Sequence, residues 1–194
     1  MIDIDLAFDP APEGVIEAND DAAVRGLLQA PEHWVAELGH WVAAMREQTR
    51  PACPDCVHSA DSISLGLQLT DDDTIAELNG QWRQKPQPTD VLSFAALEDA
   101  PLLIGEPCVE LGDIIVSVPT ARRQAEEHGH DLHWELRWLV SHGFLHLLGW
   151  DHPDDHQLAA MVRCQEQLLK HSGKVLSEEG RGSDAATTQV TPSS

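Results

Sequence analysis

The stretch from Ser141 to His152, SHGFLHLLGWDH, constrains the fold of this chain more than any other part of the sequence. His142 and His146 are four residues apart in it. Because an α-helix turns by about 100° per residue, their side chains project from the same helix face. Gly149 follows, and a glycine after the last helical turn accepts the left-handed conformation that reverses the chain. That reversal returns His152 toward the other two histidines, so we predict three imidazole rings that converge on one point.

Three imidazole rings at one point are typical of a metal site. Three protein ligands leave a fourth coordination position for water or substrate, which is the arrangement of catalytic zinc and not of closed structural sites. Without a metal ion, ring nitrogens among the neighbouring leucines would lack partners, at a cost of about 1–3 kcal/mol for each group. We therefore predict one divalent metal ion bound by His142, His146 and His152, with Zn²⁺ as the favoured ion. The same ligands also suit nickel, copper or iron.

His156 is a rival for the third ligand position, because it follows His152 by four residues. The two would share a helix face if residues 152–156 were helical. Pro153 disfavours a helical conformation of the residue before it. We therefore expect His152 in an extended turn and His156 in the next helix, which favours His152 as the ligand.

The residue after the first histidine bears on the reaction. In helical zinc proteases the motif is HExxH, and its glutamate acts as general base on the metal-bound water. Gly143 occupies that position here, which counts against peptide hydrolysis, and Asp151 is left only an orienting role toward an imidazole or a water. Phosphodiester cleavage depends more on neutralising the phosphate, so a metal ion and a cation can be enough.

Three blocks of the sequence resemble those of a known family. The segment His142 to His152 resembles the signature HGxLHLxGxDH of the YbeY family, the single-strand-specific metallo-endoribonucleases of bacterial ribosomal RNA maturation. Residues 78–94 are similar to the family's LNxxYRxxxxPTDVLSF, with Trp82 where tyrosine is usual, and residues 111–117 are similar to its LGDIxIS strand. The resemblance covers residues 60 to 172.

The resemblance implies both a site and an activity. The family's metal ligands fall on His142, His146 and His152, and its arginine, implicated in catalysis or in binding the RNA backbone, falls on Arg83. The implied activity is single-strand-specific, metal-dependent endoribonuclease cleavage in maturation of the 3′ end of small-subunit ribosomal RNA and in ribosome quality control. The implied partners are single-stranded RNA, a ribosomal RNA precursor, and the small ribosomal subunit or its proteins. A guanidinium suits the arginine's role, because it donates two parallel hydrogen bonds to phosphate and keeps its charge; alternatively, Arg83 is a solvated charge at a helix end.

Two other functions remain open. One is a metal-dependent amidase or protease, against which Gly143 counts. The other is a non-catalytic ribosome-assembly factor in which the metal only locks a binding surface. In that case substitution of a ligand should unfold the domain, and Arg83→Ala should leave RNA processing unchanged.

The formal charge of −21, from 33 acidic and 12 basic side chains, argues against nonspecific affinity for nucleic acid. A cleft is governed by its local field, however, and four cations offer a positive rim beside the metal: Arg83, Lys85, Arg122 and Arg123. The alternative is that Arg122 and Arg123 pair along their own helix with Glu126 and Glu127.

Composition sets the outer limits. No run of residues is long enough to span a bilayer, so we expect a soluble globular protein with no membrane partner. Residues 1–6 carry acids where a signal peptide needs positive charge, and four scattered cysteines form no disulfide framework, so we expect a cytoplasmic protein. Cys53 and Cys56 lie in a proline-rich connection, which disfavours a redox or second metal role. We expect one metallohydrolase domain over residues 1–175 and a disordered tail over 176–194.

Hydrophobic periodicity predicts an α+β fold, with a mixed, roughly four-stranded sheet packed with helices and the metal site on a C-terminal helix and the turn after it. Strands are predicted over residues 2–8, 63–69, 90–94 and 111–118. The last should be central, because its run Ile114 to Val116 indicates burial on both faces. Helices are predicted over residues 20–29, 31–48, from Thr70 as cap to Pro86, 120–128, 132–148 and 154–171, the last ending before Gly173. Residues 50–61 and 95–110 are predicted loops.

Overall fold

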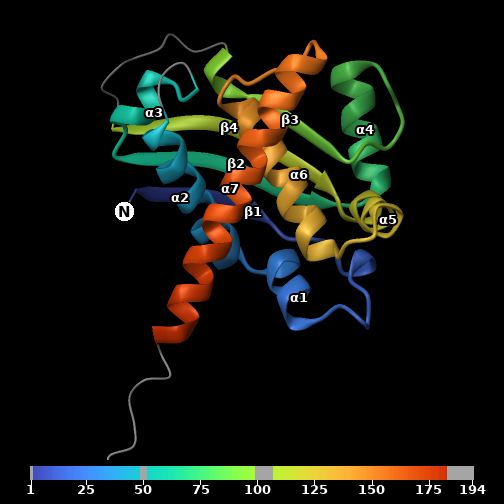
Figure 1. Cartoon of the computed structure of the whole chain (residues 1–194). Helices are drawn as coiled ribbons and strands as arrows, with labels where there is room; N and C mark the ends of the chain where they lie inside the picture. Colours follow the sequence, from blue (N-terminus) through green and yellow to red (C-terminus); the bar gives the residue numbers. More distant parts are fainter. Residues whose placement is uncertain (1, 49–51, 99–106, 183–194) are drawn as a thin grey trace, which may run out of the picture.

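A four-stranded mixed sheet with the order β1-β2-β4-β3 organises the fold (Figure 1). The computed structural model describes residues 2–48, 52–98 and 107–182. Strands β1, β2 and β4 are parallel, and β3 runs antiparallel to β4. The bounds are Asp3–Asp9 for β1, Ser62–Thr70 for β2, Val91–Ala95 for β3 and Cys108–Ser117 for β4. The predicted α+β class and mixed four-stranded sheet are confirmed, as is the central place of β4.

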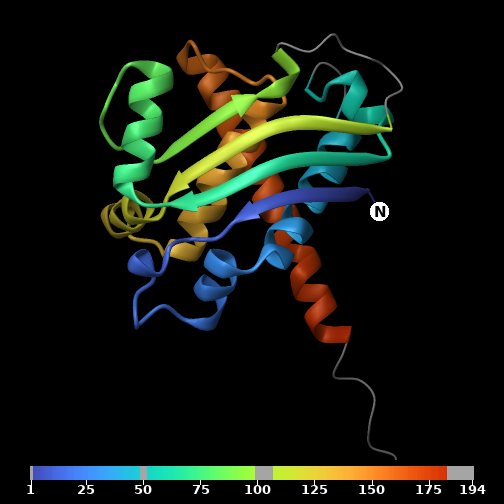
Figure 2. The ribbon, with the colours of Figure 1, turned by 180° about the vertical axis from the view of Figure 1, so that it is seen from behind.

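The two faces of the sheet differ because side chains alternate along each strand. Ile63, Leu65, Leu67 and Leu69 of β2 are buried in the main core, while the residues between them are polar or glycine. Helices α2, α6 and α7 lie across the apolar face (Figure 1), and Figure 2 shows the other face, with α4 beside one end of it. The α4 end is closed by a small second cluster of Ile75, Leu92 and Ile115. The polar face is therefore left open beyond α4 within the described residues.

Helices α1, α2, α4, α5 and α6 follow the predicted ranges closely, whereas α3 and the end of α7 do not. Their bounds are Ala22–Gln29 for α1, Pro31–Glu47 for α2, Asp55–Ser59 for α3, Asp72–Arg83 for α4, Val118–His128 for α5, Leu132–Leu147 for α6 and Asp155–Gly182 for α7, with short 3-10 turns at Glu13–Val15 and Ala96–Glu98. Trp34, Leu38 and Trp41 of α2 are fully buried, so one side of this helix belongs to the core.

Three local predictions were wrong because tertiary pairing overrode the local sequence. Residues 50–61 are not all loop, since α3 forms there and buries Cys56 and Val57. The predicted loop 95–110 contains the start of β4, which Cys108 begins by pairing with Ser62 of β2. Thr70 does not cap α4, because it is the last paired residue of β2. The cap is Asp71, whose side chain accepts from the Thr74 amide at 2.8 Å.

Helix α7 does not end before Gly173, as predicted, but continues to Gly182. One glycine costs a helix about 1 kcal/mol relative to alanine, which does not stop a long helix. The predicted tail from residue 176 therefore overlaps helix as far as 182, and its remaining part, 183–194, lies outside the described residues. Among the described residues, no helix combines the length and the apolar character that crossing a membrane requires.

Candidate metal centre and adjoining cleft

Helix α6 holds His142 and His146 firmly because one of its sides is buried against the sheet. Its N-terminus is capped by Asp131, which accepts from the Trp134 amide at 2.7 Å. Gly143 allows the close approach to β4: a Cβ atom built there would lie 2.8 Å from Cγ2 of Ile114. The position that carries glutamate in HExxH therefore faces the sheet and has no room for a longer side chain.

The turn after α6 has the form predicted for it. Gly149 adopts a φ of +87°, in the left-handed region. Its amide donates to the His146 carbonyl at 2.9 Å, and the Trp150 amide donates to the Leu145 carbonyl at 3.0 Å, which is the Schellman pattern of helix termination. The Trp150 indole also donates to the Ala52 carbonyl at 2.8 Å, which anchors the turn. The chain is thereby reversed and leads back to position 152.

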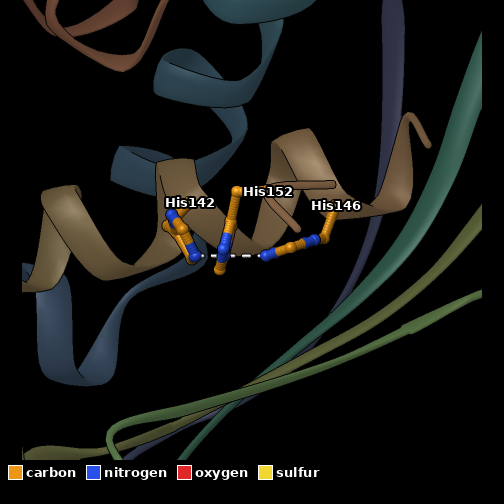
Figure 3. A group of neighbouring side chains, drawn as sticks. All are labelled: His142, His146 and His152. Atoms are coloured by element: carbon orange, nitrogen blue, oxygen red, sulfur yellow. Dashed lines mark hydrogen bonds between the residues drawn. The ribbon is translucent and has the colours of Figure 1, made fainter. Parts of the chain in front are cut away.

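The three predicted histidines come together (Figure 3). The Nε2 atoms of His142 and His146 are 3.1 Å apart. The ring centroid of His152 lies 5.3 Å from that of His142 and 5.2 Å from that of His146. Each ring therefore offers a nitrogen to one common point, with two rings from α6 and the third from the turn.

The donor set fits a divalent metal ion. Two imidazole nitrogens at 2.0–2.1 Å from a tetrahedral zinc are about 3.3 Å apart, close to the separation of His142 and His146. Burial lowers the pKa of His142 below 6.5, and burial together with the neighbouring His142 and His152 rings lowers the pKa of His146. Both rings are thus neutral near pH 7, which is the form that binds metal.

A buried glutamine fixes the orientation of His142. Gln165 of α7 is 1% exposed, and its Oε1 lies 3.2 Å from Nδ1 of His142. Its amide nitrogen donates to the Trp138 carbonyl at 3.1 Å and to the Ser141 hydroxyl at 3.3 Å. With the nitrogen engaged in this way, Oε1 is the atom that faces His142. It accepts the Nδ1 proton and leaves Nε2 of His142 with a lone pair for a metal ion.

The three rings line a cavity of about 320 Å³ whose other wall comes from the end of α4, from β3 and from the loop between them. That wall holds Arg83, Thr89, Asp90 and Ser93. Arg83 is the last residue of α4 and is exposed. Its guanidinium forms no ion pair or hydrogen bond with any residue in the ranges 2–48, 52–98 and 107–182. The structure therefore brings Arg83, as predicted, to the same cavity as the three histidines.

A larger cleft of about 960 Å³ continues from this cavity over the open face of the sheet. Arg83, Ser93 and His146 line both hollows. The rest of its lining comes mainly from Leu78 and Trp82 of α4 and from the strands, which contribute three acids, Asp9, Glu110 and Asp113. An extended ligand can thus reach the histidines from this cleft.

The predicted positive rim does not form as a whole. Arg122 pairs with Asp20 at 2.8 Å and with Glu17 at 3.1 Å, and Arg123 pairs with Asp72 at 3.0 Å. These partners come from other elements, so the alternative of ion pairs along α5 is not observed either. Their charges are neutralised away from both hollows. Among the described residues that line the two hollows, Arg83 is the only lysine or arginine.

Other candidate groups lie apart from the three histidines. His156 is exposed on α7. Cys53 and Cys56 are buried free thiols, and burial raises the pKa of Cys53 to about 11. A second group of possible metal ligands, His128, His130 and Glu135, lies where α5 meets α6; there Nε2 of His130 contacts the carboxylate of the buried Glu135.

Sequence reasoning did not identify Gln165 or the cavity residues of β3. A glutamine on the apolar side of α7, between Met161 and Leu168, was the available signal for a buried polar contact. Asp90 was read only as the start of a strand. Its carboxylate accepts from the Val91 amide at 2.8 Å and from Gln124 at 3.1 Å, so it holds β3 beside α5.

Comparisons with known proteins agree with the geometry. The family model described as Endoribonuclease YbeY matches residues 36–173. The chain is 57% identical over 178 residues to Endoribonuclease YbeY of Synechococcus sp. (strain CC9311), covering 91% of this chain and 100% of that protein. It is 52% identical over 174 residues to Endoribonuclease YbeY of Prochlorococcus marinus (strain MIT 9313), covering 90% and 93%. The solution structure of a Thermotoga maritima protein is similar with a TM-score of 0.49 and 24% identity, covering 97% of this chain and 100% of that one. On the family match and these identities, the chain belongs to the Endoribonuclease YbeY family.

Proposed function

We propose that this protein is a metal-dependent endoribonuclease that cleaves single-stranded RNA at the cavity formed by His142, His146, His152 and Arg83. The observation that carries the proposal is the guanidinium of Arg83, which has no partner among the described residues and lines the same cavity as three convergent imidazoles. Its relatives are named as endoribonucleases. The combination suits a phosphodiester better than a peptide, because a phosphate brings negative charge that needs a cation.

The chain's own residues account for binding and orientation. A divalent ion held by the three histidines, most simply Zn²⁺, would supply Lewis acidity and a bound water of lowered pKa. Arg83 donates to two oxygens of the scissile phosphate and fixes its position. Gln165 holds His142 with Nε2 toward the ion site.

The substrate we propose is a ribosomal RNA precursor, cleaved in maturation of the 3′ end of the small-subunit RNA. The sequence resemblance to the family supports this assignment, and it implies contact with the small ribosomal subunit or its proteins. A protein of charge −21 binds RNA weakly by electrostatics alone, so docking on a ribosomal particle would bring the RNA to the cleft.

The two other candidate functions are less well supported. A protease or amidase of the HExxH type needs a carboxylate at position 143, where Gly143 faces Ile114 instead. A scaffold with a structural metal does not account for an arginine in the cavity wall that lacks a partner within the part of the chain that the structure describes.

Cleavage of a single-stranded RNA oligonucleotide by the Arg83→Ala variant tests the proposal. We expect it to keep its metal and its melting temperature and to lose cleavage by about 100-fold or more, as expected for loss of a group that stabilises transition-state charge. Lys85→Ala is the matched control, because Lys85 is an exposed cation nearby that lines neither hollow. Equal cleavage by Arg83→Ala and the parent protein, or cleavage that persists after metal removal by a chelator, contradicts the proposal.

A further inference from the structure

Trp82 is the most exposed large hydrophobic side chain of the described residues. Its exposed fraction is 68%, against 40% for Leu158 and 38% for Trp134. It lies in the last turn of α4, directly before Arg83. An exposed indole presents a large, rigid apolar face to water, and because Trp82 lines the cleft, this face can receive a ligand ring.

The indole of Trp82 is held in place along one edge. It meets the ring of Phe94 on β3 at a centroid distance of 5.6 Å and an interplanar angle of 61°. Phe94 itself packs against the cluster of Ile75, Leu92 and Ile115. An edge contact of this kind fixes the orientation of the indole while leaving much of its surface to the cleft, which both rings line.

Charge in this cleft does not favour a polyanion. Its wall contains three acids, Asp9, Glu110 and Asp113. Among the described residues that line it, Arg83 is the only lysine or arginine. Attraction between the cleft and the phosphates of a long RNA is therefore weak beyond the phosphate at Arg83. Stacking of a base on an aromatic ring supplies about 1–3 kcal/mol without any charge, and every base has a face that can stack.

We propose that Trp82 is a stacking platform for an unpaired base of the RNA, next to the phosphate held by Arg83. The proposal rests on the proposed function and extends it to a base subsite. In duplex RNA the bases are stacked on their neighbours and their faces are not available, whereas a single strand can present one. The subsite therefore selects single-stranded substrates through apolar contact, in a cleft where electrostatic attraction to the phosphates is too weak to do so.

Binding measurements on the full metal-loaded protein test the subsite. We expect Trp82→Ala to weaken binding of a fluorescent single-stranded oligoribonucleotide by about 5- to 150-fold, the range that loss of one stacked base implies. Trp82→Phe, which keeps an aromatic face, should recover most of the loss. Leu158→Ala is the control, since Leu158 is also exposed but lines neither hollow.

Abasic oligonucleotides make the test specific to stacking. A series of oligonucleotides each carries one abasic site at a different position. At one position the parent protein should bind the abasic oligonucleotide as weakly as Trp82→Ala binds the intact one. Trp82→Ala should bind that abasic oligonucleotide no more weakly still. Unchanged binding by Trp82→Ala, or equal loss for every abasic position, overturns the subsite. If the parent protein binds RNA with this pattern but does not cleave it, the proposed function fails and the subsite stands; if it does not bind single-stranded RNA, both fail.

Discussion

Oε1 of Gln165 lies 3.2 Å from Nδ1 of His142, so a residue of α7 sets the tautomer of a ring on α6. Both side chains are held within packed helices, and the glutamine is 1% exposed. The orientation of the imidazole therefore does not depend on solvent.

Replacement of Gln165 by leucine should lower metal affinity about tenfold while leaving the fold intact, because contacts behind a ligand typically contribute 10- to 100-fold. Gln165→Glu keeps an acceptor for Nδ1 and should lose less. Competition with a chromophoric chelator measures the affinities. Leucine at exposed Gln157 of the same helix is the control; equal affinities for Gln165→Leu and the parent would remove Gln165 from the site.

Metal content should depend on His142 and His146 and not on His156. We expect the metal content to fall from about one ion per chain in the parent protein to near zero in His142→Ala and in His146→Ala, because two imidazoles rarely retain a catalytic ion. His156→Ala, exposed on α7, should keep the ion. Elemental analysis of purified variants decides this. Retention of the ion by both α6 variants, with loss in His130→Ala, would move the site to the second ligand group.

Alanine at two helical glycines should have opposite effects on stability. At Gly39 of α2 the nearest atom to an added Cβ is 3.8 Å away, so Gly39→Ala should raise the free energy of unfolding by about 0.5–1 kcal/mol. At Gly143 the added Cβ meets Ile114 at 2.8 Å, and overpacking costs about 1–3 kcal/mol. Gly143→Ala should therefore be destabilising in urea titrations, and Gly143→Glu more so. A stable Gly143→Glu protein would contradict the close approach of α6 to β4.

The Asp72 carboxylate should contribute stability that disappears in acid. Burial acts to raise its pKa, but hydrogen bonds from Ser117 at 2.5 Å and Thr120 at 2.7 Å, together with Arg123, lower it below 3.8. A group with a lowered folded pKa stabilises fully above its unfolded pKa and loses that contribution as pH falls through the folded value.

We therefore expect Asp72→Asn to cost about 1–2 kcal/mol at pH 7, and this difference from the parent to shrink below about pH 4. Urea titrations at several pH values measure it. Asp73→Asn, in the same helical turn but exposed, should change little. A difference that does not vary with pH would show that the charge of Asp72 is not what stabilises this junction.

The parts of this structure that local sequence could predict are those set by short-range spacing. His142, Gly149 and His152 lie in one segment, and helical periodicity with one left-handed residue was enough to bring them together. The burial of β4 on both faces followed from three consecutive apolar residues. Arg83 could be assigned to the site only through the resemblance to the family, because its position depends on how α4 and β3 meet α6.

Contacts between distant segments were beyond sequence reasoning for a physical reason. Arg122 pairs with Asp20 across 102 positions, although glutamates on its own helix stood at favourable spacing. Gln165 meets His142 only because α7 packs on α6. A charged or amide side chain has many possible partners, and tertiary packing decides among them.

The Schellman turn at Gly149 confines all three imidazoles to one short stretch of chain. An ion bound there closes only a small loop, and loop closure of this length removes little entropy from the unfolded ensemble. Because this constraint on the unfolded chain is small, an ion would stabilise the folded protein mainly through its preference for the preassembled rings, and the melting temperature should rise as the free ion concentration exceeds the dissociation constant.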